Sequence, residues 1–339
     1  MHGGDIYRNE VHMDFSVNVN PLGMPEGMEE ALCAAVKSCG NYPDPSAEKL
    51  YYTISHMLLL PKEYLLFGNG ASELFMAIVH GLKPGKTVIF VPSFYGYEYV
   101  AKAGGGEVVY YPLLEANQFQ PDEGLLEALT EDVNLLFLAN PNNPTGKLIE
   151  PMYLERLLDI CKQKGITVVL DECFIEFCEG TQSMLPKIDQ YENLIVVRAF
   201  TKIYAIPGVR LGYLVCKNQV LIDKIKCQLP EWNLSAFAQA AGEVCEGQEA
   251  FIHQTVEYVK KERIYLSQKL KKLGLLVYSG EANFILVYSE KMLYEGLLEH
   301  GILIRDCENF RGLSKGFYRI AVKSRKENEA LLKALEKIV

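Results

Sequence analysis

Residues 135–146 read Leu-Leu-Phe-Leu-Ala-Asn-Pro-Asn-Asn-Pro-Thr-Gly, a short apolar run that stops at a polar loop. The apolar run predicts a strand that is buried on both faces of a sheet. The loop 140–146 contains two prolines, each of which fixes a backbone φ, and three amide side chains. Because ligands of α/β proteins bind at the carboxyl ends of the strands, this stretch predicts both a fold class and the position of a site.

Similar apolar runs, rich in β-branched residues, recur between residues 64 and 214 and alternate with longer amphipathic stretches. They predict strands over 87–91, 135–138, 167–170 and 194–197, and helices over 97–103, 121–129 and 151–164. Pro121 and Pro151 suit a first helical turn, and Gly165 suits a C-terminal cap. Repeated strand-helix-strand units predict a mainly parallel sheet covered by helices on both faces.

The pattern changes after about residue 240 and predicts a smaller α+β region. This region is expected to contain helices over 250–273 and 291–300, strands over 275–278, 283–287 and 318–322, a strand ending at Arg305, and a last helix from Lys326. A helix over 26–38 is expected to pack on it. We therefore predict a large α/β domain over 41–240 and a small domain formed by 1–40 and 241–339.

The composition excludes several classes of protein. The 339 residues carry a net charge of −9, which argues against a nucleic-acid partner, although 301–326 holds seven basic and two acidic residues. The longest apolar stretches, such as 51–61, are shorter than the roughly 18–20 residues of a membrane span. Residues 1–5 lack the features of a secretory signal, so a cytoplasmic protein is expected. Nine irregularly spaced cysteines without a C-x-x-C pair predict free thiols and no metal site.

A second polar stretch, Gly68-Asn69-Gly70-Ala71-Ser72, follows the apolar residues Leu66 and Phe67 and opens a helix. Glycines allow close approach, and the free N–H groups of a helix start together with a serine hydroxyl can hold a phosphate. The dinucleotide fingerprint would need a third glycine where Glu73 stands, so an NAD site is not favoured. The stretch 81–87 resembles a nucleotide loop, but its glycines are too close together and it precedes a strand.

Charged side chains follow the next two predicted strands. Asp171 comes directly after 167–170, and a carboxylate at a buried strand end needs a cationic partner, such as a protonated ring nitrogen. Lys202 lies in an apolar setting, where desolvation lowers the pKa of a lysine and makes it a nucleophilic amine. Arg210, eight residues later, offers a planar fork to a phosphate.

Together, the stretch 140–146, Asp171, Lys202 and Arg210 resemble the fold-type-I pyridoxal-phosphate (PLP) enzymes of the class I/II aminotransferase group. The resemblance covers essentially the whole chain. It implies a mainly parallel, seven-stranded sheet sandwiched by helices, a smaller α+β domain, PLP as the cofactor and a homodimer.

The resemblance also implies roles for single residues. Lys202 would bind the cofactor covalently, Asp171 would pair with the ring nitrogen, Asn143 would donate to the ring oxygen, and Phe94 would stack on the ring. The cofactor phosphate would be held by Gly70, Ala71, Ser72, Thr201 and Arg210, and by Tyr42 across the dimer interface. Arg319 would bind the substrate carboxylate.

The chain departs from many of these relatives at two positions. Phe174 stands where a tyrosine commonly donates to the ring oxygen. Ala199 stands three residues before the lysine, where many relatives carry serine or threonine. We expect the chemistry to remain available, because neither change affects Lys202 or Asp171, while some binding energy for the cofactor is lost.

Two branches of the group are most similar: the L-threonine-O-3-phosphate decarboxylases of cobalamin biosynthesis and the histidinol-phosphate aminotransferases. Both would act on a small phosphorylated amino-acid-like substrate. The stretches 2–4, 14–23 and 204–208, with Phe174, favour the decarboxylase. Substrate contacts are expected from His2, Gly3, Gly4, Asn20, Arg305 and Arg319. Serine phosphate stays open as an alternative substrate, transamination as an alternative reaction, and a non-catalytic PLP-binding regulator as an alternative class.

Overall fold

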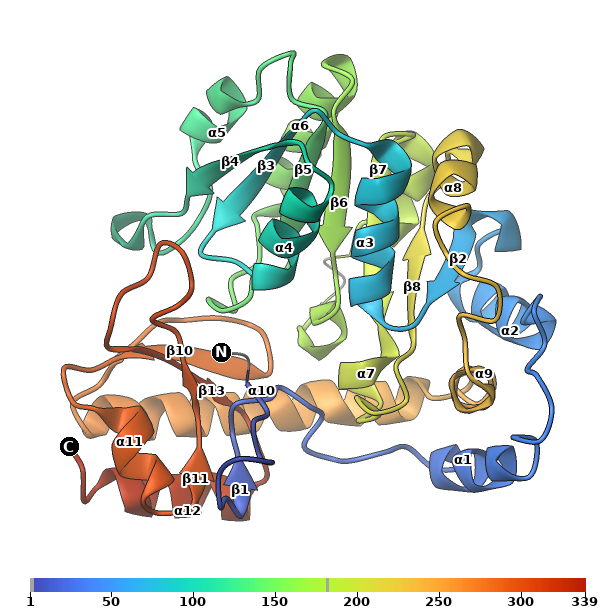
Figure 1. Cartoon of the computed structure of the whole chain (residues 1–339). Helices are drawn as coiled ribbons and strands as arrows, with labels where there is room; N and C mark the ends of the chain where they lie inside the picture. Colours follow the sequence, from blue (N-terminus) through green and yellow to red (C-terminus); the bar gives the residue numbers. More distant parts are fainter. Residues whose placement is uncertain (1–2, 181–182) are drawn as a thin grey trace.

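The computed structural model describes residues 3–180 and 183–339, which fold around a seven-stranded sheet and a smaller four-stranded sheet (Figure 1). The larger sheet consists, in spatial order, of β2 (Leu65–Gly68), β8 (Gly212–Val215), β7 (Leu194–Ala199), β6 (Thr167–Asp171), β5 (Leu135–Ala139), β3 (Lys86–Val91) and β4 (Glu107–Pro112). Among these strands, β8 runs in the direction opposite to the other six. The predicted mainly parallel sheet is therefore confirmed.

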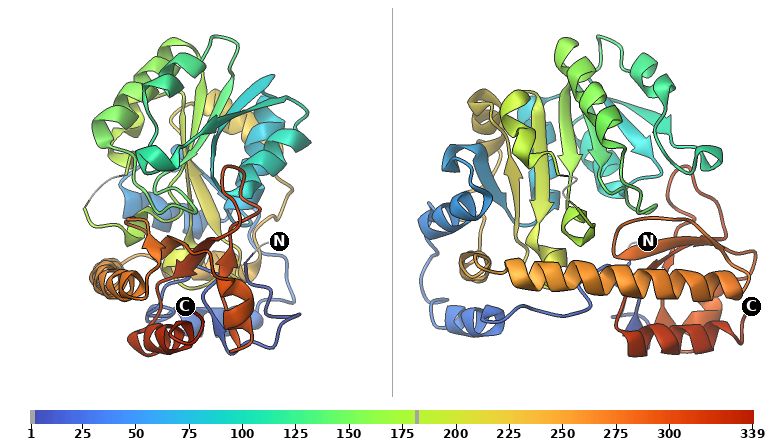
Figure 2. Two further views of the ribbon diagram at one scale, coloured as in Figure 1. Left: turned by 90° about the vertical axis from the view of Figure 1, so that its left-hand side faces the viewer. Right: turned by 180° about the vertical axis from the view of Figure 1, so that it is seen from behind.

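Helices cover both faces of this sheet because its side chains alternate between two apolar clusters. In β5, Leu135 and Phe137 belong to one cluster, and Leu136 and Leu138 belong to the other. The first cluster is completed by α3 (Ala71–Leu82), α4 (Tyr95–Ala103) and α8 (Gln219–Lys226). The second is completed by α2 (Glu48–Leu58), α5 (Glu123–Ala128), α6 (Pro151–Gln163) and α9 (Ala236–Glu243). The left view of Figure 2 shows the resulting layers.

The smaller sheet is antiparallel and has its own core. Its strands, in spatial order, are β12 (Arg305–Asp306), β13 (Phe317–Ala321), β10 (Phe284–Tyr288) and β9 (Leu276–Val277). They pack with α10 (Glu249–Lys272), α11 (Leu293–Leu298) and α12 (Arg325–Leu335). Beside them, β1 (Met13–Asp14) pairs in parallel with β11 (Ile302–Leu303). The predicted α+β region is thus confirmed.

The long helix α10 joins the two cores. Val259, in its first half, lies in a cluster of the larger sheet, whereas Leu266 and Leu270 lie in the core of the smaller sheet. Figures 1 and 2 show the helix running from below the larger sheet to the side of the smaller sheet. A single helix therefore fixes the distance between the strand ends of the larger sheet and the smaller sheet that faces them.

Two of the predicted helix ends are confirmed and a third differs from the prediction. Pro151 is the first residue of α6, and Gly165 adopts a left-handed φ of 70° after this helix. The helix expected from Pro121 begins at Glu123 instead. The side chain of Asp122 caps it by accepting a hydrogen bond from the Gly124 N–H at 3.0 Å, which leaves Pro121 outside.

The packing of the first helix also differs from the prediction. Helix α1 (Met28–Val36) contacts α9, and its Met28 lies in a cluster of the larger sheet, so the expectation that it packs on the smaller region is wrong. Instead, β1 and Phe15 join the smaller region. The domain boundaries at residues 40 and 240 stay a prediction.

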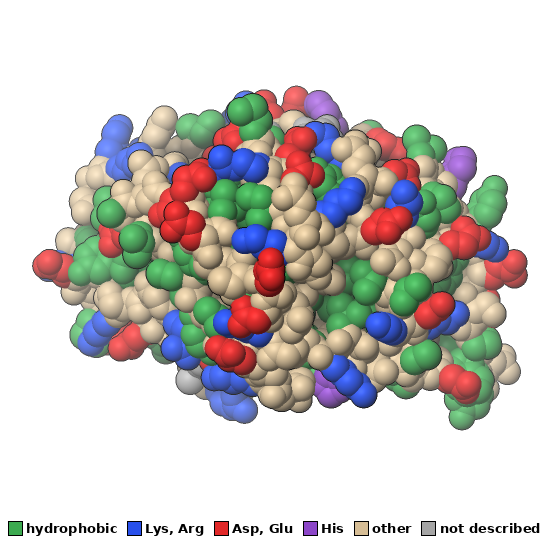
Figure 3. All heavy atoms as spheres, turned by 90° about the horizontal axis from the view of Figure 1, so that it is seen from above, with side chains coloured by type: hydrophobic (Ala, Val, Ile, Leu, Met, Phe, Trp, Pro, Cys, Tyr) green, Lys and Arg blue, Asp and Glu red, His purple; other side chains and the backbone are tan. Residues whose placement is uncertain are grey.

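The surface is mixed in charge. On the face in Figure 3, acidic and basic side chains are interspersed, as is usual for a solvated surface. No helix within residues 3–180 and 183–339 is both long and apolar enough to cross a membrane. The same part of the chain has no group of three or more His, Cys, Asp or Glu side chains placed to hold a metal ion.

Candidate active site

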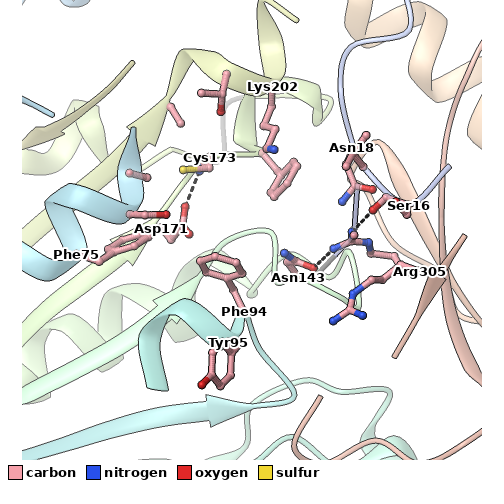
Figure 4. A pocket seen from close by; sticks show the side chains of 18 of the residues that line it. Ser16, Asn18, Phe75, Phe94, Tyr95, Asn143, Asp171, Cys173, Lys202 and Arg305 are labelled. Carbon is pink, nitrogen blue, oxygen red and sulfur yellow. Dashed lines mark hydrogen bonds between the residues drawn. The ribbon is translucent and has the colours of Figure 1, made fainter. Parts of the chain in front are cut away.

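A cavity of about 230 Å³ lies between the carboxyl ends of the larger sheet and the smaller sheet. Figure 4 shows Lys202, Asp171 and Asn143 around one open space, although they come from different strand ends. Its lining also includes Gly3, Ser16, Val17, Asn18, Ala71, Ser72, Phe75, Phe94, Tyr95, Cys173, Phe174, Ala199, Thr201, Arg210, Arg305, Phe310 and Arg319. The structure therefore brings together most of the side chains that the sequence singled out.

Lys202 lies in α7 (Phe200–Ile203), the short helix that directly follows β7. Burial lowers the pKa of its amine to about 8, and the positive charge of Arg319 acts in the same direction. The backbone carbonyl of Lys202 accepts a hydrogen bond from the N–H of Asn20 at 3.0 Å, which holds the turn. A substantial fraction of the amine is therefore neutral, and able to attack a carbonyl carbon, near neutral pH.

Asp171 ends β6, and its carboxylate is buried at the floor of the cavity. Burial raises its pKa, while hydrogen bonds from Cys173 and Tyr97 act in the opposite direction. Its Oδ1 accepts the backbone N–H of Cys173 at 2.9 Å, and its Oδ2 accepts the phenol of Tyr97. A buried carboxylate of this kind is stabilised by a cationic ligand group placed against it.

The start of α3 offers a site for a phosphate. Gly70 has a left-handed φ of 78°, and a Cβ there would collide with the guanidinium of Arg210. No side chain among the described residues caps this helix, so the N–H groups of Ala71 and Ser72, two residues that line the cavity, have no capping acceptor there. N–H groups at the start of a helix, together with a guanidinium, make an anion site.

Two buried arginines face the same cavity from the smaller sheet. Arg305 and Arg319 stand opposite each other on β12 and β13, and their side chains are 8% and 7% exposed. Their hydrogen-bond partners in the described part of the chain are neutral: Asp306 O and Asn309 for Arg305, Asn143 and Ser16 O for Arg319. Neighbouring buried cations with neutral partners are costly, so the arrangement fits a ligand with two anionic groups.

The strongest evidence for a bound anionic ligand is the Nε of Arg319. It is buried and has no hydrogen-bond partner among the described residues, which is expensive for a charged donor. Burial lowers the pKa of Arg319 to about 10. Asn143 accepts from Arg319 through Oδ1, so its Nδ2 remains for other acceptors.

The other residues expected in the site are distributed as follows. Phe94, Thr201 and Gly3 line the cavity, and the N–H of Gly4 donates to Ser16 Oγ at 2.7 Å beside it. Asn20 does not line it, because its Nδ2 donates to Ile203 O and to Thr255 Oγ1. Tyr42 is 81% exposed, with its ring 5.0 Å from that of Trp232, and lies outside the cavity of its own chain. His2 lies outside the described residues.

The sequence reasoning missed several lining residues. Asn18 and Ser16 line the cavity and both lie in the stretch 14–23, in which the sequence predicts Asn20 as the substrate contact. Asn18 lines the cavity, and its buried Oδ1 has no partner in the described chain, so it is an acceptor available to a ligand.

The two departures from the group both lie at the cavity. Ala199 and Phe174 line it. The ring of Phe174 packs edge-on against Phe284, and the guanidinium of Arg319 lies 5.3 Å from the centroid of that same Phe284 ring. Phe174 thus supports the position of Arg319 in place of offering a hydroxyl.

Comparison with known proteins gives a consistent picture. Residues 10–338 match the family of class I and II aminotransferases. Threonine-phosphate decarboxylase from Salmonella typhimurium is 38% identical over 331 residues, which cover 96% of this chain and 91% of that protein. The adenosylcobalamin biosynthesis bifunctional protein CobDQ from Leptospira interrogans is 34% identical over 96% of this chain and 38% of its own length.

Among solved structures, the histidinol-phosphate aminotransferase from Clostridium acetobutylicum superimposes with a TM-score of 0.90 at 35% identity. The match covers 96% of this chain and 98% of that one. The fold, the arrangement of charged side chains at the strand ends and these similarities agree, and the chain belongs to the class I and II aminotransferase family.

Proposed function

We propose that the protein is a PLP-dependent decarboxylase that converts L-threonine O-3-phosphate into (R)-1-amino-2-propanol phosphate and CO2 in cobalamin biosynthesis. The observation that carries the proposal is the pair of buried arginines, Arg305 and Arg319, facing Lys202 and Asp171 across one cavity. A substrate with a phosphate at one end and a carboxylate at the other supplies two anionic groups to these arginines.

The residues of the cavity fit pyridoxal phosphate. Lys202 would bind its aldehyde carbon, Asp171 would bind its ring nitrogen, and Phe94 would cover a face of the ring. Its phosphate would be held by Gly70, Ala71, Ser72, Thr201 and Arg210, with Tyr42 from a second copy of the chain. When bound, this cofactor accepts the electrons of a bond broken at the α-carbon of an amino acid.

The arginines determine which bond of the substrate is exposed to reaction. Arg305 would hold the phosphate, and Arg319 would orient the carboxylate with the help of Asn143. Two anchors at opposite ends of a short substrate would fix its orientation, and decarboxylation requires that this orientation present the bond to the carboxylate to the cofactor. The amine of Lys202, with its pKa of about 8, can then deliver a proton from Nζ to the α-carbon that CO2 has left.

A direct assay separates this function from transamination. Reconstituted protein incubated with threonine phosphate is expected to release one CO2 for each aminopropanol phosphate formed, without loss of the aldehyde form of the cofactor. Formation of a keto acid together with pyridoxamine phosphate would contradict decarboxylation and would support an aminotransferase. Serine phosphate, which lacks one methyl group of threonine phosphate, is the comparison substrate. Because one methyl group in a pocket changes the rate by only about 10–200-fold, we expect serine phosphate to react more slowly by a factor in this range.

The second candidate is a histidinol-phosphate aminotransferase, which the similarity to the Clostridium acetobutylicum structure favours. In that case histidinol phosphate would be consumed faster than threonine phosphate and no CO2 would appear. The remaining candidate is a PLP-binding regulator without activity. A lysine with a pKa lowered to about 8 beside two buried arginines argues against it, because a regulator needs no substrate anchors.

The pKa of Lys202 predicts how fast the cofactor-free protein captures PLP at different pH values. The amine reacts only when neutral, so with a pKa of about 8 the rate should rise roughly tenfold from pH 6 to pH 7 and level off above about pH 9. Stopped-flow absorbance gives the rate of PLP capture at each pH. Dividing this rate by the rate for Nα-acetyl-lysine at the same pH shows how the reactivity of Lys202 differs from that of an ordinary lysine. A constant ratio over this range would show that Lys202 has an ordinary pKa.

We also propose a cytoplasmic homodimer. Tyr42 is an exposed aromatic side chain packed beside Trp232, and exposed aromatics of this kind are typical of interfaces. Analytical ultracentrifugation tests the assembly: a dimer that dissociates when Tyr42 and Trp232 are both replaced by serine supports it. A monomeric wild-type protein that is fully active would contradict it.

A further inference from the structure

Tyr97 lies directly behind the candidate active site and makes a single polar contact with it. The side chain is fully buried in α4, and its phenol donates to the Oδ2 of Asp171, 74 positions away in the sequence. Tyr97 does not line the cavity, whereas Asp171 does. The phenol therefore approaches the carboxylate from the protein side and leaves the cavity side free for a ligand.

Three aromatic rings hold Tyr97 in this position. Its ring is stacked on Phe137 at a centroid distance of 5.2 Å and an angle of 9°. Phe75 and Phe94 contact it edge-on, at 5.2 Å and 5.6 Å. Because rotation of the ring would disrupt three contacts, the hydroxyl has one accessible direction, which is toward Asp171.

Two of these three rings, Phe75 and Phe94, are themselves part of the cavity wall. Phe94 directly precedes α4 and lines the cavity, and Tyr97 follows it one helical turn later. The same helix therefore carries the aromatic expected to cover the cofactor ring and the phenol that contacts the carboxylate expected at the ring nitrogen. Displacing Tyr97 would change both contacts together.

We propose that Tyr97 is a positioning residue that fixes the direction and the charge distribution of the Asp171 carboxylate. Together with the Cys173 N–H on Oδ1, it gives each carboxylate oxygen at least one donor from the protein. This proposal rests on the proposed function only in that Asp171 serves a cofactor.

The titration of the two groups is consistent with this role. Burial and the neighbouring Asp171 raise the pKa of Tyr97 well above its usual value, so the phenol stays a donor at every pH the enzyme meets. The hydrogen bond from this phenol lowers the pKa of Asp171, against the effect of burial. Removing the phenol must therefore raise the pKa of Asp171 and make the carboxylate a stronger base.

The first experiment uses the protein without cofactor, so its outcome does not depend on the proposed reaction. Infrared spectra over a pH series contain the carbonyl band of protonated Asp171, identified by its absence in Asp171→Asn. In Tyr97→Phe, which keeps the volume of the ring, we expect this band to appear at a pH higher by about one unit. Tyr99→Phe, an exposed tyrosine on the same helix, is the matched control and should leave the band unchanged.

The second experiment uses the protein loaded with PLP. A more basic Asp171 draws the ring-nitrogen proton toward itself, so the pH at which the visible absorption of the bound cofactor changes should move upward in Tyr97→Phe. CO2 release should fall about tenfold, with little change in the KM for threonine phosphate, because no substrate anchor is altered. Urea unfolding of each variant shows whether the fold is intact.

The outcomes separate this proposal from the proposed function. An unshifted Asp171 band and an unshifted cofactor spectrum in folded Tyr97→Phe would overturn the role of Tyr97 and show an ordinary core tyrosine. Shifted spectra in a protein that releases no CO2 would support Tyr97 while contradicting the decarboxylase.

Discussion

Replacing Lys202 by alanine lowers the kcat for CO2 release from threonine phosphate by about 10³-fold or more, the largest effect we expect from any single substitution. The amine has a lowered pKa, which makes it nucleophilic near neutral pH, and lies in the short helix that follows β7 at the edge of the sheet where the cavity is. Both its covalent role and its proton-transfer role end with its removal. Borohydride should no longer fix PLP to the protein.

The controls distinguish a chemical loss from a folding defect. Lys202→Ala removes a charge that burial disfavours, so its stability to urea should equal or exceed that of the wild type. Lys272→Ala, at an exposed position at the end of α10, should retain full activity. Added methylamine should restore part of the rate in Lys202→Ala, because a small amine can occupy the space left by the side chain. Activity within tenfold of the wild type in folded Lys202→Ala would contradict the assignment.

Lys202 and Asp171 could be predicted from the sequence because their position depends on local structure. Asp171 ends one short apolar strand and Lys202 lies three residues after another, and parallel strands bring their carboxyl ends to one edge of the sheet. The strand pattern was visible because buried parallel strands are nearly continuous apolar runs. In contrast, β4 lies at the sheet edge with partly exposed side chains, and the antiparallel β8 is only four residues long, so neither was predicted.

Some residues lie where the sequence did not predict them, because their positions are fixed by contacts between segments that are far apart in the chain. Asn20 was expected at the substrate, but its amide is taken by Ile203 O and by Thr255, 235 positions away. A periodic pattern shows that α1 has a buried side without showing which helix covers it. The contact between Tyr97 and Asp171 had no signal in the sequence, because an apolar helix face with one tyrosine is the usual composition of a core helix.

The second-largest effect is expected when Arg305 or Arg319 is replaced by alanine. The roles of the two arginines can be separated by comparing threonine phosphate with unphosphorylated threonine as substrates. Arg305→Ala should lower kcat/KM for threonine phosphate by about 10²-fold, equivalent to about 3 kcal/mol, the usual loss when one partner of a buried charge pair is removed. The slow reaction with unphosphorylated threonine should change by less than about threefold, because that substrate has no group for Arg305. Arg319→Ala should lower kcat/KM for both substrates by a similar factor of about 10²-fold.

The geometry explains why the two arginines should differ although they stand opposite each other. The guanidinium of Arg305 lies 5.0 Å from the centroid of Phe310 and donates to Asn309, so it faces the outer end of the cavity. Arg319 is bound to Asn143, which comes from the larger sheet, so it faces the reacting centre. Arg156→Ala, on the exposed side of α6, is the matched control for removal of a guanidinium. Equal losses on both substrates in Arg305→Ala, or a phosphate-selective loss in Arg319→Ala, would reverse the assignment and place the substrate in the opposite direction across the cavity.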